Sequence, residues 1–385
     1  MAGECPRASD HPALSLARWP AADQLLWEVA HRTPDFLEAG GHGASWRPAS
    51  QRSAARAYGR WLGWLTAQGV DLDAEAPASR FTLERIRAYV AFLQQGRASV
   101  TVASYVGVLC MVMRALLPDA DWGWLRAVQR RLRQRSVPVR HKQQRLVPAN
   151  DLRQLGLDLI ERAGRVLDAP CTAATPPRLR IAAARDYRDG LLIAMLASRP
   201  LRVGNLLGIE IGEHLRRSGD RTTLSFKAQE TKQKRALHTV WPEDLAPALT
   251  RYLAEVRPML IAAPAGENVA RNARALGARL WVGQGGTPLS PAGLQKALQR
   301  HTTRRFGHIV NAHLFRDCLA TTLANEDPNH VRYAAPLLGH TTLRTTERGY
   351  IAADSRVALG RHHDHLTAMR KAARKQQRAA RKNAP

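Results

Sequence analysis

Helical periodicity before residue 136 is the feature that most constrains how this chain folds. Apolar residues recur there at three- and four-residue spacing in four stretches, which begin near Ser50, after Thr82, after Ser99 and near Trp124. This spacing predicts amphipathic helices. We therefore predict a compact all-α domain over residues 49–136, whose aromatic side chains form its core rather than platforms for stacking bases.

A basic segment that contains prolines follows this domain, at residues 137–148. Such a composition is typical of an interdomain linker. Its charge would let it lie along a phosphate backbone while two domains close around a duplex, although a solvated hinge would have the same composition. The candidate DNA-binding residues are basic side chains of this segment and of the helix end before it, namely Arg130, Arg131, Arg133, Arg135, Arg140, Lys142 and Arg145.

A second domain is predicted over residues 149–360, where helices accompany a β-hairpin. Its clearest elements are a buried helix over Arg185–Ala197 and two strands over Thr222–Phe226 and Ala236–Trp241. Ser290 followed by Pro291 fits the start of another helix.

The two ends of the chain carry a less clear pattern, and the first shows one weak helical stretch around Asp23–Ala30. Residues 1–48 are interpreted as an N-terminal arm or tail, and residues 361–385 as a basic C-terminal tail. The predicted fold class is thus mainly α with a small β-hairpin or sheet, arranged as a two-domain clamp.

The charge of the chain indicates a polyanionic partner. Its 385 residues include 58 Lys and Arg against 32 Asp and Glu, a formal net charge of +26. Such an excess attracts nucleic acid. The longest apolar run is Leu191–Ala197, which is too short to span a bilayer, so no membrane partner is expected.

The N-terminus and the cysteines indicate the compartment. No secretory signal is visible, so we expect a cytoplasmic protein. Four cysteines, Cys5, Cys110, Cys171 and Cys318, show neither CxxC pairing nor zinc spacing. We expect reduced, mostly buried thiols.

Three separated segments carry the candidate chemistry. They are Ser198–Leu207 (SRPLRVGNLL), Asn311–Leu323 (NAHLFRDCLATTL) and Leu337–Tyr350 (LLGHTTLRTTERGY). Neither a G-x-x-x-x-G-K-[ST] loop nor HExxH or G-x-S-x-G is present, which removes the usual support for nucleotide, peptide and ester hydrolysis. A His-x-x-Arg pair such as His313 and Arg316 is common by itself, so the order and spacing of all three segments carry the interpretation.

In that order and at that spacing, the three segments resemble the signature boxes of the tyrosine recombinase, or phage integrase, family. The first resembles its Leu-Arg-x-x-(Glu/Asn)-Leu-Leu box, the second its His-x-x-Arg box, and the third its Leu-Gly-His box followed by a nucleophilic tyrosine. The resemblance covers the chain from about Leu146 to Tyr350. Before that it rests on the helical architecture alone, which is similar to the family's core-binding domain.

The resemblance implies a role for each matching residue. Arg202 and Arg316 would hold the non-bridging oxygens of the scissile phosphate. His313 would hydrogen-bond that phosphate or assist proton transfer, and His340 would donate to it or position the nucleophile. Tyr350 would attack phosphorus and expel the 5′-hydroxyl, leaving a 3′-phosphotyrosyl bond.

A lysine of the hairpin turn acts as general acid in this family. Glu230, Thr231 and Lys232 resemble the Glu-Thr-Lys sequence of that turn, so Lys232 is the candidate. Lys227 and Lys234 are near enough to remain alternatives. Two guanidiniums and a lysine supply the positive charge that other nucleases take from magnesium, so neither a metal nor another cofactor is expected.

The sequence departs from the family pattern at two places. Ser198-Arg199-Pro200 stands where a Thr-Gly turn is common, and ten residues separate His340 from Tyr350 where many members have nine. Gly349 occupies the ninth position and has no hydroxyl. Asp317 follows Arg316, where it would either orient the guanidinium or face solvent.

Two other tyrosines are rival hydroxyls. Neither Tyr187 nor Tyr333 follows a Leu-Gly-His box, so both are interpreted as packing residues.

The implied function is site-specific recombination or integration of double-stranded DNA, as in the integrases of mobile elements. The family acts as a tetramer on two DNA sites, with a dimer on each, and other recombinases would be possible partners. Two alternatives remain open at this stage. One is a type IB topoisomerase, which shares the chemistry, and the other is a DNA-binding accessory protein that has the fold without turnover.

Overall fold

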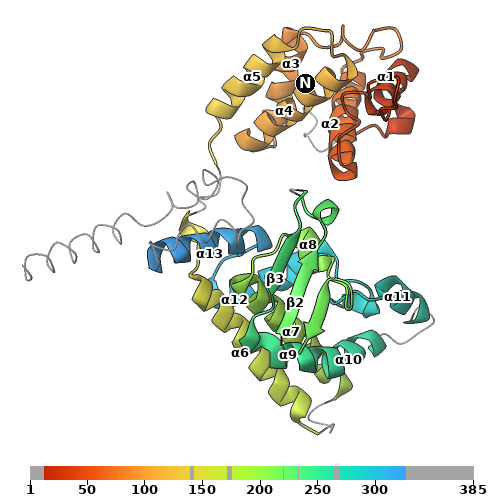
Figure 1. Ribbon diagram of the computed structural model, residues 1–385. Coiled ribbons are helices and arrows are strands. Elements are labelled where there is room, and N and C mark those ends of the chain that lie inside the picture. Colours follow the sequence, from red (N-terminus) through yellow and green to blue (C-terminus); the bar gives the residue numbers. More distant parts are fainter. Residues whose placement is uncertain are drawn as a thin grey trace, which may run out of the picture. The chain divides into compact units, whose positions relative to one another are not determined.

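The protein, in its computed structural model, consists of two compact units, residues 1–141 and 142–385. The structure describes residues 13–138, 143–170, 176–219, 221–232, 234–263 and 269–326. Each unit is mostly helical, and the second also contains a small antiparallel sheet (Figure 1). The predicted fold class, mainly α with a small sheet, is confirmed in these respects.

The helices of the first unit agree with the periodicity of its sequence. They are α1 (Ala21–His31), α2 (Pro48–Ala67), α3 (Leu83–Gln94), α4 (Ser99–Leu116) and α5 (Gly123–Gln134). Thr82 caps α3 by accepting a hydrogen bond from the amide of Arg85. The four helices predicted from residue 50 onward are therefore confirmed as α2 to α5.

Aromatic side chains fill the core of this unit. Trp61 and Tyr58 are fully buried, and the Trp61 ring lies 4.8 Å from that of Phe81 and 5.1 Å from that of Tyr89, measured between centroids. Rings at such distances pack favourably beyond the area that they bury. The prediction that these aromatics form the core is confirmed.

Helix α4 is the most apolar helix of the first unit. It is the only helix among the described residues that is long and apolar enough to span a membrane by length and composition. Val106, Leu109 and Val112 on this helix are fully buried against the rest of the unit. This packing is that of a core helix in a globular domain.

Cys110, also on α4, is a buried free thiol.

The first unit extends further toward the N-terminus than the sequence prediction places it. Trp19 and Trp27 belong to the same core as Trp61, so residues from Leu14 onward are part of the unit and not a separate tail. The apolar periodicity of the sequence predicts only a weak helix here, because α1 is held in place by a buried polar contact. The carboxylate of Asp23 accepts hydrogen bonds at 2.9 Å from Arg80 and at 2.5 Å from the Tyr58 hydroxyl.

Asp23 and Arg80 are a buried ion pair, with side chains 0% and 1% exposed. Replacing Asp23 with Asn should lower the free energy of unfolding of the first unit by about 3–5 kcal/mol, because the Arg80 guanidinium would lose its counter-charge inside the core. Urea denaturation followed by tryptophan fluorescence measures this. Glu28→Gln, at an exposed position of the same helix, is the matched control. Equal stability of the two variants would contradict the assigned role.

The second unit contains eight helices among its described residues. They are α6 (Ala149–Asp168), α7 (Pro177–Ser198), α8 (Val203–Leu207), α9 (Ala246–Arg251), α10 (Arg257–Ala262), α11 (Val269–Leu276), α12 (Pro291–Phe306) and α13 (Ala312–Glu326). A π-helical turn, Tyr252–Val256, joins α9 to α10. As predicted, Ser290 caps α12, since its hydroxyl accepts a hydrogen bond from the amide of Gly293 at 3.0 Å.

Helices α6 and α7 approach each other closely enough for their backbones to touch. A Cβ atom added to Gly156 would lie 2.6 Å from the carbonyl oxygen of Gly190, and one added to Gly190 would lie 2.6 Å from that of Gly156. Only glycine fits such a crossing. Helix α7 is buried along Leu191–Ala197, so the predicted buried helix is confirmed and forms the centre of the unit.

The sheet has three antiparallel strands in the order β1 (Leu215–Ser218), β2 (Arg221–Phe226) and β3 (Leu237–Val240). The predicted hairpin is confirmed, with Ser225 opposite His238 and Phe226 opposite Leu237. Strand β1 was not predicted, because three of its four residues are exposed and give no alternating pattern.

The core of the second unit fixes the short helix α8. The indole nitrogen of Trp281 donates to the carbonyl of Leu206 at 3.0 Å, and the amide of Leu280 donates to the carbonyl of Ile209 at 2.9 Å. Leu206, Leu280 and Trp281 are all buried. The segment that begins at Arg202 is thereby held against the centre of the unit.

Candidate active site

Arg202 stands at the N-cap position of α8, with extended backbone geometry, where the chain turns away from α7. Its side chain is half-buried. Burial lowers the pKa of Arg202 from its ordinary value, because the charged guanidinium loses contact with water. The residue thus presents a cation that is only partly solvated.

Arg316 lies on α13, more than a hundred residues further along the chain, and is 8% exposed. Its Nη1 donates to the carbonyl of Pro200 at 2.6 Å, two residues before Arg202. Burial and the positive charge of Arg202 lower the pKa of Arg316 to about 10. The fold therefore brings these two predicted arginines together. An anion placed beside them would interact favourably with both charges.

His313 occupies the first turn of α13, three residues before Arg316, and is exposed. The side chain of Asn311 accepts a hydrogen bond from the amide of Leu314 at 3.0 Å and so caps this helix. Residues three apart share a helical face. The imidazole is thus presented to solvent on the side of the helix that carries the Arg316 guanidinium.

Lys232 is exposed in the connection between β2 and β3, as the sequence predicts. Of the two alternatives, Lys227 forms an ion pair with Glu213 at 2.9 Å, and this hydrogen bond raises the pKa of Lys227. Lys234 is also exposed and has a positive φ of 52°. A paired ammonium gives up its proton less readily, so the structure favours Lys232 over Lys227 as an acid.

His340 and Tyr350 lie outside the described residues, as do the rival Tyr333 and the basic residues Arg140 and Lys142. Their predicted roles stay predictions. The other rival, Tyr187, is buried on α7 and donates a hydrogen bond to the carbonyl of Ala248 at 3.2 Å. This is the packing role predicted for it.

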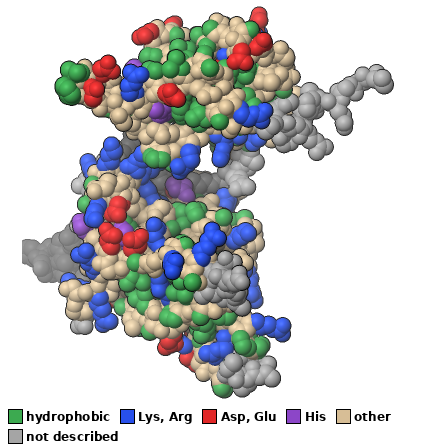
Figure 2. Space-filling view, turned by 90° about the vertical axis from the view of Figure 1, so that its right-hand side faces the viewer, with side chains coloured by type: hydrophobic (Ala, Val, Ile, Leu, Met, Phe, Trp, Pro, Cys, Tyr) green, Lys and Arg blue, Asp and Glu red, His purple; other side chains and the backbone are tan. Residues whose placement is uncertain are grey.

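The basic residues predicted to contact DNA fall into two groups. At the end of α5, Arg130, Arg131, Arg133 and Arg135 are all exposed. Figure 2 shows Lys and Arg side chains on the visible surface of both units. Arg145 differs, because its Nη2 donates to the carbonyl of Ile309 at 2.5 Å and thereby links the start of the second unit to the loop before α13. Part of its guanidinium is used in packing.

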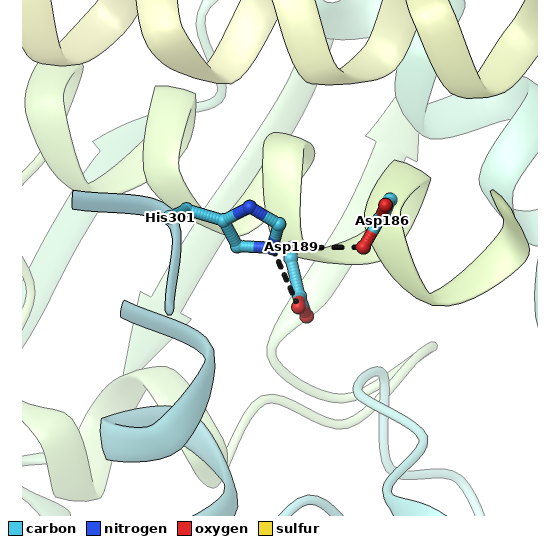
Figure 3. A group of neighbouring side chains, drawn as sticks. All are labelled: Asp186, Asp189 and His301. Carbon is cyan, nitrogen blue, oxygen red and sulfur yellow. Dashed lines mark hydrogen bonds and ion pairs between the residues drawn. The ribbon is translucent and has the colours of Figure 1, made fainter. Parts of the chain in front are cut away.

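One partly buried polar cluster was missed by sequence reasoning. Asp186 and Asp189 project from α7 toward His301 of α12 (Figure 3). Oδ1 of Asp189 accepts hydrogen bonds from Arg188, and its Oδ2 accepts from Arg300 at 2.9 Å and contacts Nε2 of His301 at 3.2 Å. The spacing of the acidic residues on α7 is the only local signal of this cluster, since Arg300 and His301 are more than a hundred residues away from Asp189.

The chemistry of this cluster favours a structural role. Its three potential metal ligands lie close together, but both oxygens of Asp189 already accept hydrogen bonds from guanidinium groups. Two neighbouring arginines would also repel a cation. Arg188 further donates to the carbonyl of Val282 at 2.5 Å. The cluster thus ties α7 to α12 and to the strand-like segment that supports α8.

Replacing Asp189 with Asn should lower the free energy of unfolding of the second unit by about 3–5 kcal/mol, because the buried Arg188 guanidinium would lose its counter-charge. Burial alone would raise the pKa of Asp189, but the hydrogen bond from His301 and the charge of Arg188 outweigh it, so the pKa lies below 3.8. A lowered pKa in the folded state means that the stabilisation is complete above 3.8 and is lost as the pH falls below that value.

Chemical denaturation of wild type and Asp189→Asn at several pH values measures this difference. It should be constant at neutral pH and shrink in acid. Asp151→Asn, at an exposed position of α6, should cost less than about 1 kcal/mol. A difference that grows toward low pH would refute the assigned ionisation.

Comparison with solved structures shows the fold of the tyrosine recombinases. XerH site-specific recombinase bound to difH substrate, in a pre-cleavage complex, superposes with a TM-score of 0.50 at 14% sequence identity, covering 91% of this chain and 98% of that one. XerH bound to palindromic difH in a post-cleavage complex gives 0.44 at 13% identity, over 91% and 98% of the two chains. XerA recombinase gives 0.38 at 14% identity, over 84% and 94%. No protein-family model and no curated protein matches the sequence.

Proposed function

We propose that this chain is a site-specific tyrosine recombinase, which breaks and rejoins double-stranded DNA through a covalent bond between Tyr350 and a 3′-phosphate. The observation that carries the proposal is the pair formed by Arg202 and Arg316. Within a tyrosine recombinase fold, the two guanidiniums are held close enough for each charge to act on the other, and both are partly removed from water. Two such guanidiniums are suited to bind one phosphate group together.

The reaction follows from the chemistry of these groups. The Tyr350 oxygen attacks phosphorus as its hydroxyl proton passes to a base, for which His313 or water is available. The bond from phosphorus to O5′ breaks, and Lys232 gives a proton to the leaving oxygen. Arg202 and Arg316 stabilise the negative charge that increases on the non-bridging oxygens in the pentacoordinate transition state. His313 and His340 would add hydrogen bonds to the same phosphate. Religation is the reverse, with a 5′-hydroxyl attacking the phosphotyrosine.

The net charge of +26 and the exposed arginines of α5 support DNA as the partner. We further propose a cytoplasmic protein that acts as a dimer on each site and as a tetramer on two sites, with or without other recombinases. Integration or excision of a mobile element is the use of this chemistry that we favour.

A covalent DNA adduct is the decisive test. Wild-type protein, incubated with nicked duplexes that carry candidate sites, should form an adduct that survives denaturing electrophoresis. Tyr350→Phe should form none, since it lacks the attacking oxygen, whereas Tyr333→Phe should match wild type. Arg316→Ala should slow adduct formation by about 100-fold or more, because one charge contact in the transition state is lost.

The other outcomes separate the alternative functions. A folded wild-type protein that binds DNA but traps no adduct on any substrate would favour an accessory DNA-binding protein. An adduct that forms without site preference, together with relaxation of supercoiled plasmid, would favour a type IB topoisomerase. Either result would contradict the proposed recombinase.

Salt dependence tests the DNA-binding surface. If Arg130 and Arg133 each contact one phosphate, replacing both with Ala should reduce the slope of log affinity against log salt by about 2, since about one counterion is released per contact. Arg165→Ala on α6, an exposed arginine that pairs with Glu161, is the control and should leave the slope unchanged. Fluorescence anisotropy with labelled duplex gives the slopes. An unchanged slope in the double variant would exclude these arginines.

A further inference from the structure

The connection between β2 and β3 is a closed turn that leaves Lys232 exposed. Thr231 is buried, and its hydroxyl donates to the carbonyl of Arg235 at 2.7 Å and accepts from the amide of the same residue at 3.1 Å. These bonds join the two sides of the turn directly around Lys232. The position of the lysine is therefore set by whatever fixes the backbone at residues 230 and 231.

Glu230 is the residue that fixes this backbone. Its carboxylate accepts hydrogen bonds from the amide of Lys227 at 2.6 Å and from Nε2 of His214 at 2.9 Å. Its main-chain carbonyl accepts from the side chain of Asn205 at 3.4 Å. Asn205 lies on α8, three residues after Arg202. The turn is thus hydrogen-bonded both to His214, the residue before β1, and to α8, the helix that begins after Arg202.

His214 is the support behind Glu230, and its hydrogen bonds define its protonation. Its ring is 6% exposed and packs against Phe226, with centroids 5.1 Å apart. Nδ1 accepts a hydrogen bond from the amide of Glu210 at 3.1 Å, so the ring proton must be on Nε2, which donates to Glu230. Both nitrogens are occupied. The nearby group of Glu210, Glu213 and His214 is therefore not suited to bind a metal ion.

We propose that His214 and Glu230 are positioning residues, which hold the turn of Lys232 in register with Arg202 so that the lysine can protonate the leaving oxygen. This inference rests on the proposed recombinase function. Neither residue touches the substrate in this scheme. They act through the backbone of the turn, and a small displacement of a catalytic group can cost about 100-fold in rate.

A sulfur atom in place of the bridging O5′ separates proton donation from all other functions of the site. Tyrosine attack then breaks the bond from phosphorus to sulfur. The sulfur leaves as a thiolate without needing a proton, because a thiol is a far stronger acid than an alcohol. A variant impaired only in proton donation should recover on this substrate. A variant impaired in charge stabilisation should not.

The experiment compares adduct formation on oxygen-bridged and sulfur-bridged nicked DNA. On oxygen-bridged DNA, Lys232→Ala should slow the reaction by about 100-fold or more, and His214→Phe, which keeps a ring against Phe226, by about 10- to 100-fold. On sulfur-bridged DNA, both should react within a few-fold of wild type. His214→Gln retains an N–H donor toward Glu230 and should be less impaired than His214→Phe. Arg316→Ala should remain slow on both substrates.

His238→Phe is the matched control, since His238 is an exposed histidine of the same hairpin that contacts Ser225 and not the turn. If His214→Phe is not folded by circular dichroism, Glu230→Ala takes its place in the same comparison. A folded His214→Phe or Glu230→Ala that is equally slow on both substrates, or as fast as wild type on both, would overturn the inference. Failure of wild type itself on both substrates would instead refute the proposed function.

Discussion

The arrangement of the site depends on holding two like charges near enough for each to act on the other. Arg202 and Arg316 raise each other's free energy when both are protonated, and the lowered pKa of Arg316 reflects this together with its burial. The apolar core of the second unit offsets this cost. Leu206, Trp281 and Phe315 are fully buried around the two segments, so separating the charges would also expose large apolar side chains. In the proposed function, a phosphate bound beside both arginines would relieve this repulsion.

The supporting structure lies mostly on α7. This helix is buried along half its length, crosses α6 at Gly190 and carries the buried Asp189 that binds Arg188 and Arg300. From Arg188 a hydrogen bond continues to Val282, next to Trp281, which holds α8 through Leu206. Buried charged groups and apolar packing thus both hold α8 in place. The exposed parts of the site, His313 and the turn of Lys232, are carried by elements attached to this centre.

Local sequence patterns predicted the elements whose stability comes from a continuous apolar face. The helices from residue 50 to 135, the hairpin and the start of α12 were found in this way, and the resemblance of three segments located Arg202 and Arg316 before their proximity was visible. Elements held by distant polar partners were not found. Helix α1 depends on the bond between Asp23 and Arg80, 57 residues away, and Asp189 depends on Arg300, 111 residues away. Neither pairing leaves a periodic signal.

The contact between Gly156 and Gly190 limits how the second unit can move. Packed helices commonly slide past each other by small amounts as their interdigitating side chains change rotamer. At this crossing the two glycines have no side chains to rearrange, and the main-chain atoms of α6 and α7 lie close together. We therefore expect α6 and α7 to move together as one rigid element. Any rearrangement that a multistep reaction requires must therefore be absorbed by connections away from this crossing.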